Sequence, residues 1–364
     1  MNQETLDQHE HGSGETASLE MCRVRLSYKE ADLLLGVLAS QYRILAPVRL
    51  PGRGRFSDQD AIRYGEIHSV GEIVHQERAH FSPKEVVFPI SQTLFHLTED
   101  EMHEPAGDPR DLLIFLRACD IHGFARLDDI FLRNGLVPDP YYARRREKVK
   151  FVLLECRQSL DAYCFCVAMG TNRTDANAMA VRFADEQLLI EMRDPALFSA
   201  LPATAEPVKF TPEFPATDSQ TVSIPDSDRL QTAIRARNFF AHPMWADYAK
   251  RCIACGRCNT HCVTCSCFTT YDIADAQQPL AGERRRVWAG CHIDRFTDMA
   301  GGHHFRDDNG SRMRYKTMHK IFDFHQRFGR HMCVGCGRCD AHCPEYLSFA
   351  ECITRISHVL EEEG

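Results

Sequence analysis

The sequence predicts an α+β fold, in which a mixed N-terminal α/β domain is followed by a mainly helical, ferredoxin-like domain with two cysteine motifs. Residues 111–116 and 150–154 are short apolar runs typical of buried strands, and residues 124–132 have helical spacing. Residues 228–250 and 313–328 have amphipathic helical spacing, and each of these stretches leads directly into a cysteine motif. We therefore expect a helix to lead directly into each motif, and we expect the chain between the motifs to be largely helical.

Composition along the chain predicts the domain boundaries. Residues 1–20 are polar and acidic and predict a disordered tail, and residues 21–192 form the α+β domain. Residues 193–227 predict a linker, because six prolines fall in this segment among Ser, Thr and Ala. Residues 228–364 are expected to form the helical domain that carries the motifs.

The overall composition is that of a folded globular protein, with 44% hydrophobic and 26% charged residues. The net charge of -8 disfavours nucleic acid or an anionic membrane as a partner, and no apolar run approaches the roughly 20 residues of a membrane span. The 17 cysteines occur without a recognisable secretory signal, which indicates a reducing compartment, the cytoplasm. Cysteines in such a compartment more often bind metal than form disulfides.

Eight of these cysteines form two copies of the spacing C-x2-C-x2-C-x3-C. In two-cluster ferredoxins, three closely spaced cysteines bind one 4Fe-4S cluster and the fourth binds the other cluster. The spacing therefore predicts two electron-transfer clusters and no catalytic residue. The ligands expected for the first cluster are Cys252, Cys255, Cys258 and Cys343. Those expected for the second cluster are Cys333, Cys336, Cys339 and Cys262.

Both motifs contain the sequence Cys-Gly-Arg-Cys, with Gly256 before Arg257 and Gly337 before Arg338. Glycine lets backbone N–H groups approach a cluster sulfur, although an ordinary turn uses glycine equally well. A nearby guanidinium would favour the more negative, reduced state of a cluster. The alternative of two zinc sites is disfavoured, because zinc usually takes two separated pairs of ligands.

The remaining cysteines leave the number of clusters open. Four of them lie in the N-terminal domain, two after predicted strands and two in a loop, and strand ends could bring them together around a third cluster. Scattered buried cysteines are also common and inert. These four are Cys119, Cys156, Cys164 and Cys166. A further set close to the first motif is a competing source of ligands: Cys265, Cys267 and Cys291. Cys22 and Cys352 are assigned no role.

Several segments resemble a known family, the iron-sulfur electron-transfer subunits of anaerobic sulfite reductase. The segments that carry this resemblance are 286–306 (RVWAGCHIDRFTDMAGGHHFR), 313–324 (MRYKTMHKIFDF) and 332–349 (MCVGCGRCDAHCPEYLSF). In the first domain, three segments resemble the same family and its relatives, the β subunits of sulfhydrogenase-type complexes: 117–122, 141–146 and 164–171. The likeness covers most of the chain past residue 40. Val263 departs from the family, which usually has proline there, and valine is expected to loosen the turn.

The resemblance implies a cytoplasmic, anaerobic, three-subunit oxidoreductase complex. In it, a flavin subunit takes electrons from NADH, this subunit relays them, and a sirohaem subunit reduces sulfite to sulfide. The relay subunit is not expected to be catalytic alone. The alternative is an electron-transfer β subunit of a cytoplasmic hydrogenase or sulfhydrogenase. A binding module that senses oxygen or reads DNA is disfavoured, because a basic face would be expected and the chain is acidic.

Overall fold

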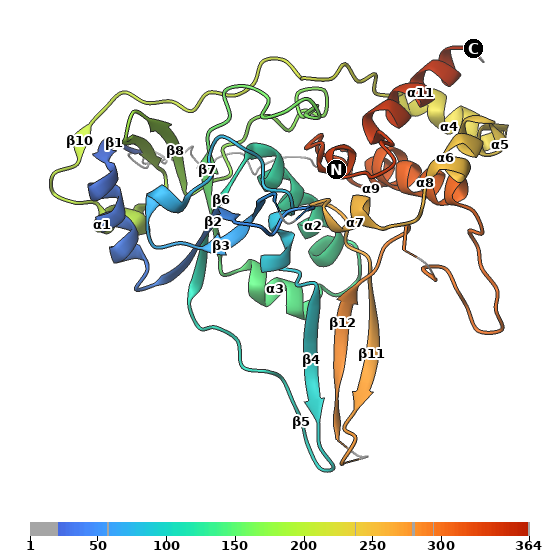
Figure 1. Ribbon diagram of the computed structural model, residues 1–364, viewed down its shortest axis with the longest axis horizontal. Helices are drawn as coiled ribbons and strands as arrows, with labels where there is room; N and C mark the ends of the chain where they lie inside the picture. Colours follow the sequence, from blue (N-terminus) through green and yellow to red (C-terminus); the bar gives the residue numbers. More distant parts are fainter. Residues whose placement is uncertain (1–20, 57, 237, 279–280, 294, 363–364) are drawn as a thin grey trace, which may run out of the picture.

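The computed structural model describes residues 21–56, 58–236, 238–278, 281–293 and 295–362. The tail expected at residues 1–20 lies outside the described residues. The fold is α+β, as predicted, with a large sheet at one end of the molecule and a group of helices at the other (Figure 1). Among the described residues, no helix is long and apolar enough to cross a membrane.

The large sheet has eight strands among the described residues, in the order β10-β1-β9-β8-β7-β6-β2-β3. The pairs β2–β6, β6–β7 and β7–β8 are parallel, and the outer pairs are antiparallel. The strands are β1 (Cys22–Ser27), β2 (Tyr42–Leu50), β3 (Ala61–Glu66), β6 (Asp111–Leu116), β7 (Val149–Leu154), β8 (Met179–Ala184), β9 (Gln187–Met192) and β10 (Glu206–Pro207).

Helices cover both faces of this sheet. On β6, Leu113 and Phe115 pack in the core that includes α1 (Tyr28–Leu38), whereas Ile114 and Leu116 pack in the core that includes α2 (Ala118–Arg133) and α3 (Pro140–Arg146). A parallel strand buried on both faces must be apolar throughout, which explains why the run was recognisable in the sequence. The strands expected at 111–116 and 150–154 are β6 and β7, and the helix expected at 124–132 is part of α2.

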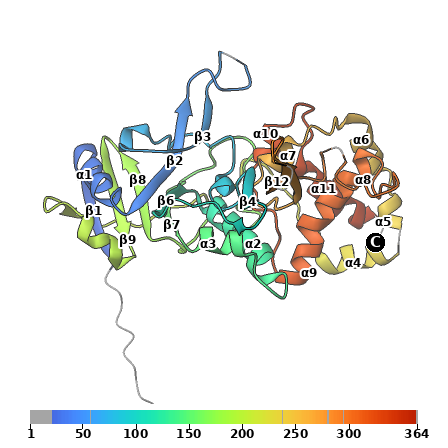
Figure 2. The same ribbon diagram turned by 90° about the horizontal axis from the view of Figure 1, so that it is seen from below.

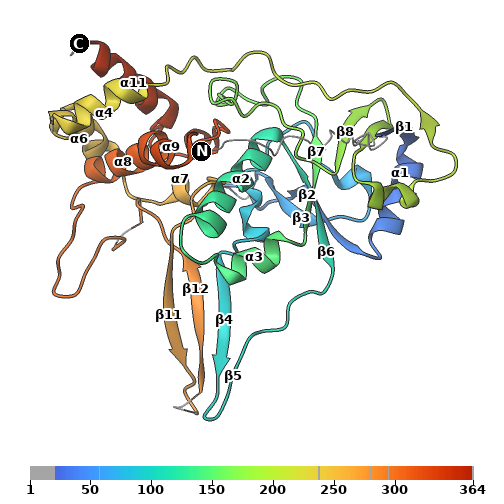
Figure 3. The same ribbon diagram turned by 180° about the vertical axis from the view of Figure 1, so that it is seen from behind.

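The second sheet has the order β11-β12-β4-β5 and projects from the body as a blade (Figures 1 and 3). Its strands are β4 (Ser91–Leu97), β5 (Met102–His103), β11 (Phe268–Ala274) and β12 (Gly282–Trp288). The expectation that the chain between the motifs is largely helical is therefore wrong for this hairpin. Residues 268–274 (FTTYDIA) are rich in β-branched and aromatic residues, which favour a strand once β4 supplies a partner for β12.

The helices of the C-terminal part gather at the opposite end of the molecule (Figure 2). They are α4 (Ser227–Arg235), α5 (Asn238–Ala241), α6 (Met244–Arg251), α8 (Asn309–Met318), α9 (Phe324–Phe328) and α11 (Phe349–Glu362). The single helix expected at 228–250 is divided into three. Pro243 accounts for the break between α5 and α6, because it disfavours a helical conformation in the preceding residue. The helix expected at 313–328 is continuous, but a π-helical turn, η4 (His319–Asp323), joins α8 to α9.

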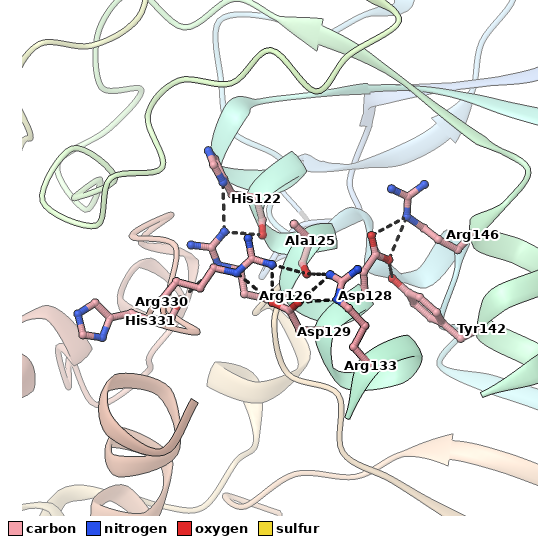
Figure 4. A network of polar contacts seen from close by, with 10 residues as sticks. All are labelled: His122, Ala125, Arg126, Asp128, Asp129, Arg133, Tyr142, Arg146, Arg330 and His331. Carbon is pink, nitrogen blue, oxygen red and sulfur yellow. Dashed lines mark hydrogen bonds and ion pairs between the residues drawn. The ribbon is translucent and has the colours of Figure 1, made fainter. Parts of the chain in front are cut away.

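A network of charged side chains joins α2 to the chain just before the second motif (Figure 4). Asp129 accepts hydrogen bonds from Arg133 (Nε–Oδ1 2.9 Å) and from Arg330 (Nε–Oδ2 2.9 Å). Arg126 donates to the carbonyl oxygen of His331 at 3.2 Å. The second motif therefore begins from a segment that is anchored on the N-terminal α/β domain.

Candidate metal centres

The two motifs have the same backbone conformation. Ala254 and Gly256 in the first motif have φ values of 52° and 72°, and Gly335 and Gly337 in the second have 63° and 69°. Alternating left-handed residues turn successive N–H groups toward one side of a loop and form a concave site for an anion. The short helices α7 (Arg257–Thr260) and α10 (Arg338–Ala341) begin directly after the second left-handed residue of each motif, and Figure 2 shows them near each other between the sheet and the helices.

The first set of predicted ligands surrounds one cavity, called here the first cage. Its wall includes Cys252, Cys255 and Cys258 of the first motif together with Cys343 of the second motif. Cys339 lies on the same wall. The structure thus brings the fourth cysteine of the second motif to the first three cysteines of the first motif.

The second set, called here the second cage, gathers around the remaining cysteine of the first motif. Cys262 interacts electrostatically with each of Cys333, Cys336 and Cys339. The backbone N–H of Gly335 donates to Cys333 Sγ at 3.5 Å. Cys339 thus belongs to the second cage and also lies on the wall of the first cage, so the two cages are direct neighbours.

Three lysines are buried around the cages, and the sequence reasoning did not find them. Lys84 is 1% exposed, and Lys316 and Lys320 are 3% exposed. Lys320 Nζ lies 3.6 Å from Cys262 Sγ and donates to Thr264 Oγ1 at 2.8 Å. Lys84 Nζ donates to the carbonyl oxygens of Cys265 (2.9 Å) and Asn259 (3.2 Å). The sequence feature that could have indicated these lysines is the spacing of Lys316 and Lys320, which puts both side chains on one face of a helix.

These lysines provide a test of whether the cages fit iron-sulfur clusters. Within the described ranges, no carboxylate lies at ion-pair distance from any of the three. Burial lowers the pKa of Lys84, whereas for Lys320 the thiolates of Cys262 and Cys265 outweigh burial and hold the pKa above its usual value. A buried ammonium group needs a negative partner. A cubane with four thiolates carries net negative charge, so the donor set and its surroundings fit this cofactor.

Arg338 has a structural role besides the electrostatic one expected for it, and it also interacts electrostatically with Cys336. Its guanidinium is buried and binds both carboxylate oxygens of Asp120 on α2, at 2.6 and 2.8 Å. Its Nε donates to the carbonyl oxygen of Ala79 at 2.8 Å. The carboxylate of Asp120 therefore balances the charge of Arg338. Through these contacts Arg338 anchors the second motif on the α/β domain.

Two histidines, one from each motif, face each other. His261 and His342 precede the last cysteine of each motif, and their ring centroids are 4.4 Å apart. Burial lowers the pKa of His261 to about 4 and that of His342 to about 3. Both rings are therefore neutral at pH 7 and add no charge beside the last cysteine of either motif.

The other cysteines next to the first motif lie near ligands of both cages, because Cys265 is hydrogen-bonded to Cys262 and Cys291 interacts electrostatically with Cys258. Asn259 Nδ2 is 3.6 Å from Cys265 Sγ and 3.4 Å from Cys291 Sγ. A hydrogen bond joins Cys265 to Cys262, and Cys267 interacts electrostatically with Cys291. These three cysteines remain a competing source of ligands.

Val263, the departure from the family pattern, is fully buried. It packs in a small apolar cluster with Val334 and Cys336, against which Cys119 also packs. A Cβ added at Gly123 of α2 would lie 2.5 Å from the Val263 side chain. Valine at this position therefore fills the contact between α2 and the first motif.

Comparison with known proteins defines the class of protein. Residues 251–347 match the family model of a 4Fe-4S dicluster domain. The chain thus binds two 4Fe-4S clusters, and it is an iron-sulfur electron-transfer subunit. The alternative of a zinc scaffold finds no support in this match.

A curated relative extends the likeness to most of the chain. The chain is 28% identical to the sulfhydrogenase 2 subunit beta of Pyrococcus furiosus over 328 residues, which cover 86% of this chain and 92% of the relative. That relative is part of an oxidoreductase complex. The expected assignment to sulfite reductase is not confirmed by this relative, which corresponds to the alternative instead. No solved structure gives a significant match.

Proposed function

We propose that this chain is the β-type electron-transfer subunit of a hydrogenase- or sulfhydrogenase-type complex in the cytoplasm. The similarity to the sulfhydrogenase 2 subunit beta along 92% of that protein supports this proposal. The proposed ligands of the first cluster are Cys252, Cys255, Cys258 and Cys343. Those of the second cluster are Cys333, Cys336, Cys339 and Cys262.

The observation that carries the electron-transfer role in this proposal is the contact between the two cages. Cys339 belongs to the second cage and forms part of the wall of the first, and Cys343 on the same short segment belongs to the first cage. An electron can therefore pass from one site to the other without leaving the protein interior. Bound 4Fe-4S clusters supply one-electron redox chemistry.

The side chains of this subunit set the conditions for that transfer. The thiolates hold the sites in place, and Lys316 and Lys320 stabilise the negative charge that increases on reduction. The neutral pair of His261 and His342 adds no charge beside the last cysteine of either motif. No side chain moves a proton in this scheme.

The test is to purify the tagged full-length chain anaerobically from its native host together with its partners. We expect a nickel-containing subunit to co-purify, and we expect the complex to reduce a dye with hydrogen as the electron donor. Replacing a proposed ligand, Cys343→Ser, should abolish transfer through this subunit, whereas Cys22→Ser on β1 should not change it. A complex without nickel, or one in which Cys343→Ser transfers electrons normally, would contradict the proposal.

The second candidate is the relay subunit of anaerobic sulfite reductase, favoured by the segments 286–306 and 332–349. Its partners would be an NADH-oxidising flavin subunit and a sirohaem subunit. The same purification distinguishes the two, because sirohaem absorption with NADH-dependent sulfide formation would replace nickel and hydrogen oxidation. Under either function, the isolated chain should form no sulfide from sulfite.

A further inference from the structure

Four cysteines of the N-terminal domain meet at one edge of the large sheet. β6 and β7 are adjacent parallel strands, with Leu116 paired to Leu153, so their carboxyl ends lie side by side. Cys119 follows β6 in the first turn of α2, and Cys156 follows β7. The carboxyl ends of parallel strands are where α/β sheets usually place their binding groups.

The loop that supplies the other two cysteines is buried at the same edge. Cys164 and Cys166 are 8% and 7% exposed. The carboxylate of Asp218 accepts hydrogen bonds from the N–H groups of Val167 (2.8 Å) and Ala168 (2.6 Å). Such contacts fix the position of the loop instead of leaving its cysteines scattered in the core.

Electrostatic interactions connect the four thiols. Cys119 interacts electrostatically with Cys166, and Cys156 interacts with Cys164. Cys166 also interacts electrostatically with Cys164 and Cys156. Four thiols held together in this way have the same donor chemistry as the two cages in the C-terminal part.

The second cage lies directly against this group. The N–H of Phe165 donates to the carbonyl oxygen of Gly335 at 2.8 Å, and Thr171 Oγ1 donates to the carbonyl oxygen of Val334 at 2.7 Å. A Cβ at Gly335 would collide with the backbone of Phe165, so glycine permits this close approach. The loop that holds Cys164 and Cys166 therefore packs against the backbone of the second motif.

Arginine side chains lie where a further anionic site would need them. Arg78 Nη1 is 3.8 Å from Cys164 Sγ and also donates to the carbonyl oxygen of Cys336 in the second cage. Its Nη2 pairs with Asp161 at 2.5 Å. Arg117 is buried, donates to the carbonyl oxygen of Glu155, and interacts with the Cys156 thiol. Arg78 thus links the four cysteines to the second cage.

We propose that Cys119, Cys156, Cys164 and Cys166 bind a third 4Fe-4S cluster, which extends the relay from the second cluster into the α/β domain. The inference rests on the proposed electron-transfer function. One electron passes between the second and third clusters, so that one is oxidised as the other is reduced, and no bond or proton is exchanged. Cys156 lines a surface cleft together with His75, Arg157 and Arg182, so the third cluster lies near a face that an external redox partner can approach.

The test is to count iron and acid-labile sulfide in the anaerobically purified full-length chain, with its partner subunits if these are needed for solubility. Three clusters predict about twelve iron per chain, and two predict about eight. The double variant Cys164→Ser/Cys166→Ser should lose about four iron and one reduced-cluster EPR signal. The matched control Cys22→Ser should keep the full count.

Each of the other possible outcomes refutes the proposal of a third cluster for a different reason. A count of about eight iron in the wild-type chain leaves the two-cluster relay intact but refutes the third cluster, and it requires no variant to fold. Eight iron with one zinc that disappears in Cys156→Ser would show a structural zinc site instead. Absence of iron and labile sulfide from the wild-type chain would refute the proposed electron-transfer function as well.

Discussion

Replacing Lys320 with methionine tests whether the buried lysines set the reduction potential of the second cluster. Lys320 Nζ is 3.6 Å from Cys262 Sγ, and the side chain is 3% exposed, so solvent screens this charge little. The centre of a bound cluster lies beyond the sulfur, at about 6 Å, where a unit charge contributes about 3 kcal/mol at an effective dielectric constant of about 20. For a one-electron couple this corresponds to a decrease in potential on the order of 100 mV.

The assay is an anaerobic redox titration followed by EPR, with the cluster content of each variant measured beforehand. Methionine has nearly the length of lysine but no charge, so Lys320→Met should retain its clusters. Lys209→Met removes an exposed lysine outside the helical end and should leave the potential unchanged. If Lys320→Met retains both clusters and titrates at the wild-type potential, the electrostatic argument is refuted.

Three further predictions concern stability, measured by anaerobic denaturant unfolding. Arg338→Met should lower the unfolding free energy by about 3–5 kcal/mol, because it leaves Asp120 buried and unpaired. Adding Asp120→Asn to this variant should restore much of the lost stability, and a double variant that stays as unstable as Arg338→Met would contradict the argument. Gly123→Ala should lower the unfolding free energy by about 1–3 kcal/mol, because the added methyl group collides with the Val263 side chain. Adding Val263→Ala should remove the collision and restore stability, and a double variant without this gain would show that the loss has another cause. Burial, followed by the charge of Lys320, lowers the pKa of His319 to about 4. Its contribution to stability is therefore present above about pH 6.5 and is lost as pH falls toward 4, with a slope of up to about 1.4 kcal/mol per pH unit that His319→Gln should remove. An unchanged slope in that variant would count against the assignment.

The sequence by itself determined the features that depend on local spacing. The two C-x2-C-x2-C-x3-C motifs predicted two clusters, because three thiolates two residues apart can only converge on one site. The strand at 111–116 was recognisable because residues 112–116 form a continuous apolar run, which is typical of a parallel strand with both faces buried. The repeated glycine left its own role open in the sequence, and the structure shows that Gly256 and Gly337 adopt left-handed conformations.

Only the tertiary structure decided what lies around these motifs. The β11–β12 hairpin depends on pairing with β4, nearly two hundred residues earlier in the chain, so its local pattern alone did not identify it. Lys84 reaches Cys265 across 181 positions, and Arg338 reaches Asp120 across 218, so no local pattern could reveal either contact. Cys119 and Cys156 lie at the same edge of the sheet because β6 and β7 are adjacent and parallel. The sequence did not determine this pairing of the two strands. Ligand spacing is a local property of the chain, whereas the charges and neighbours that tune a cluster come from contacts between distant segments.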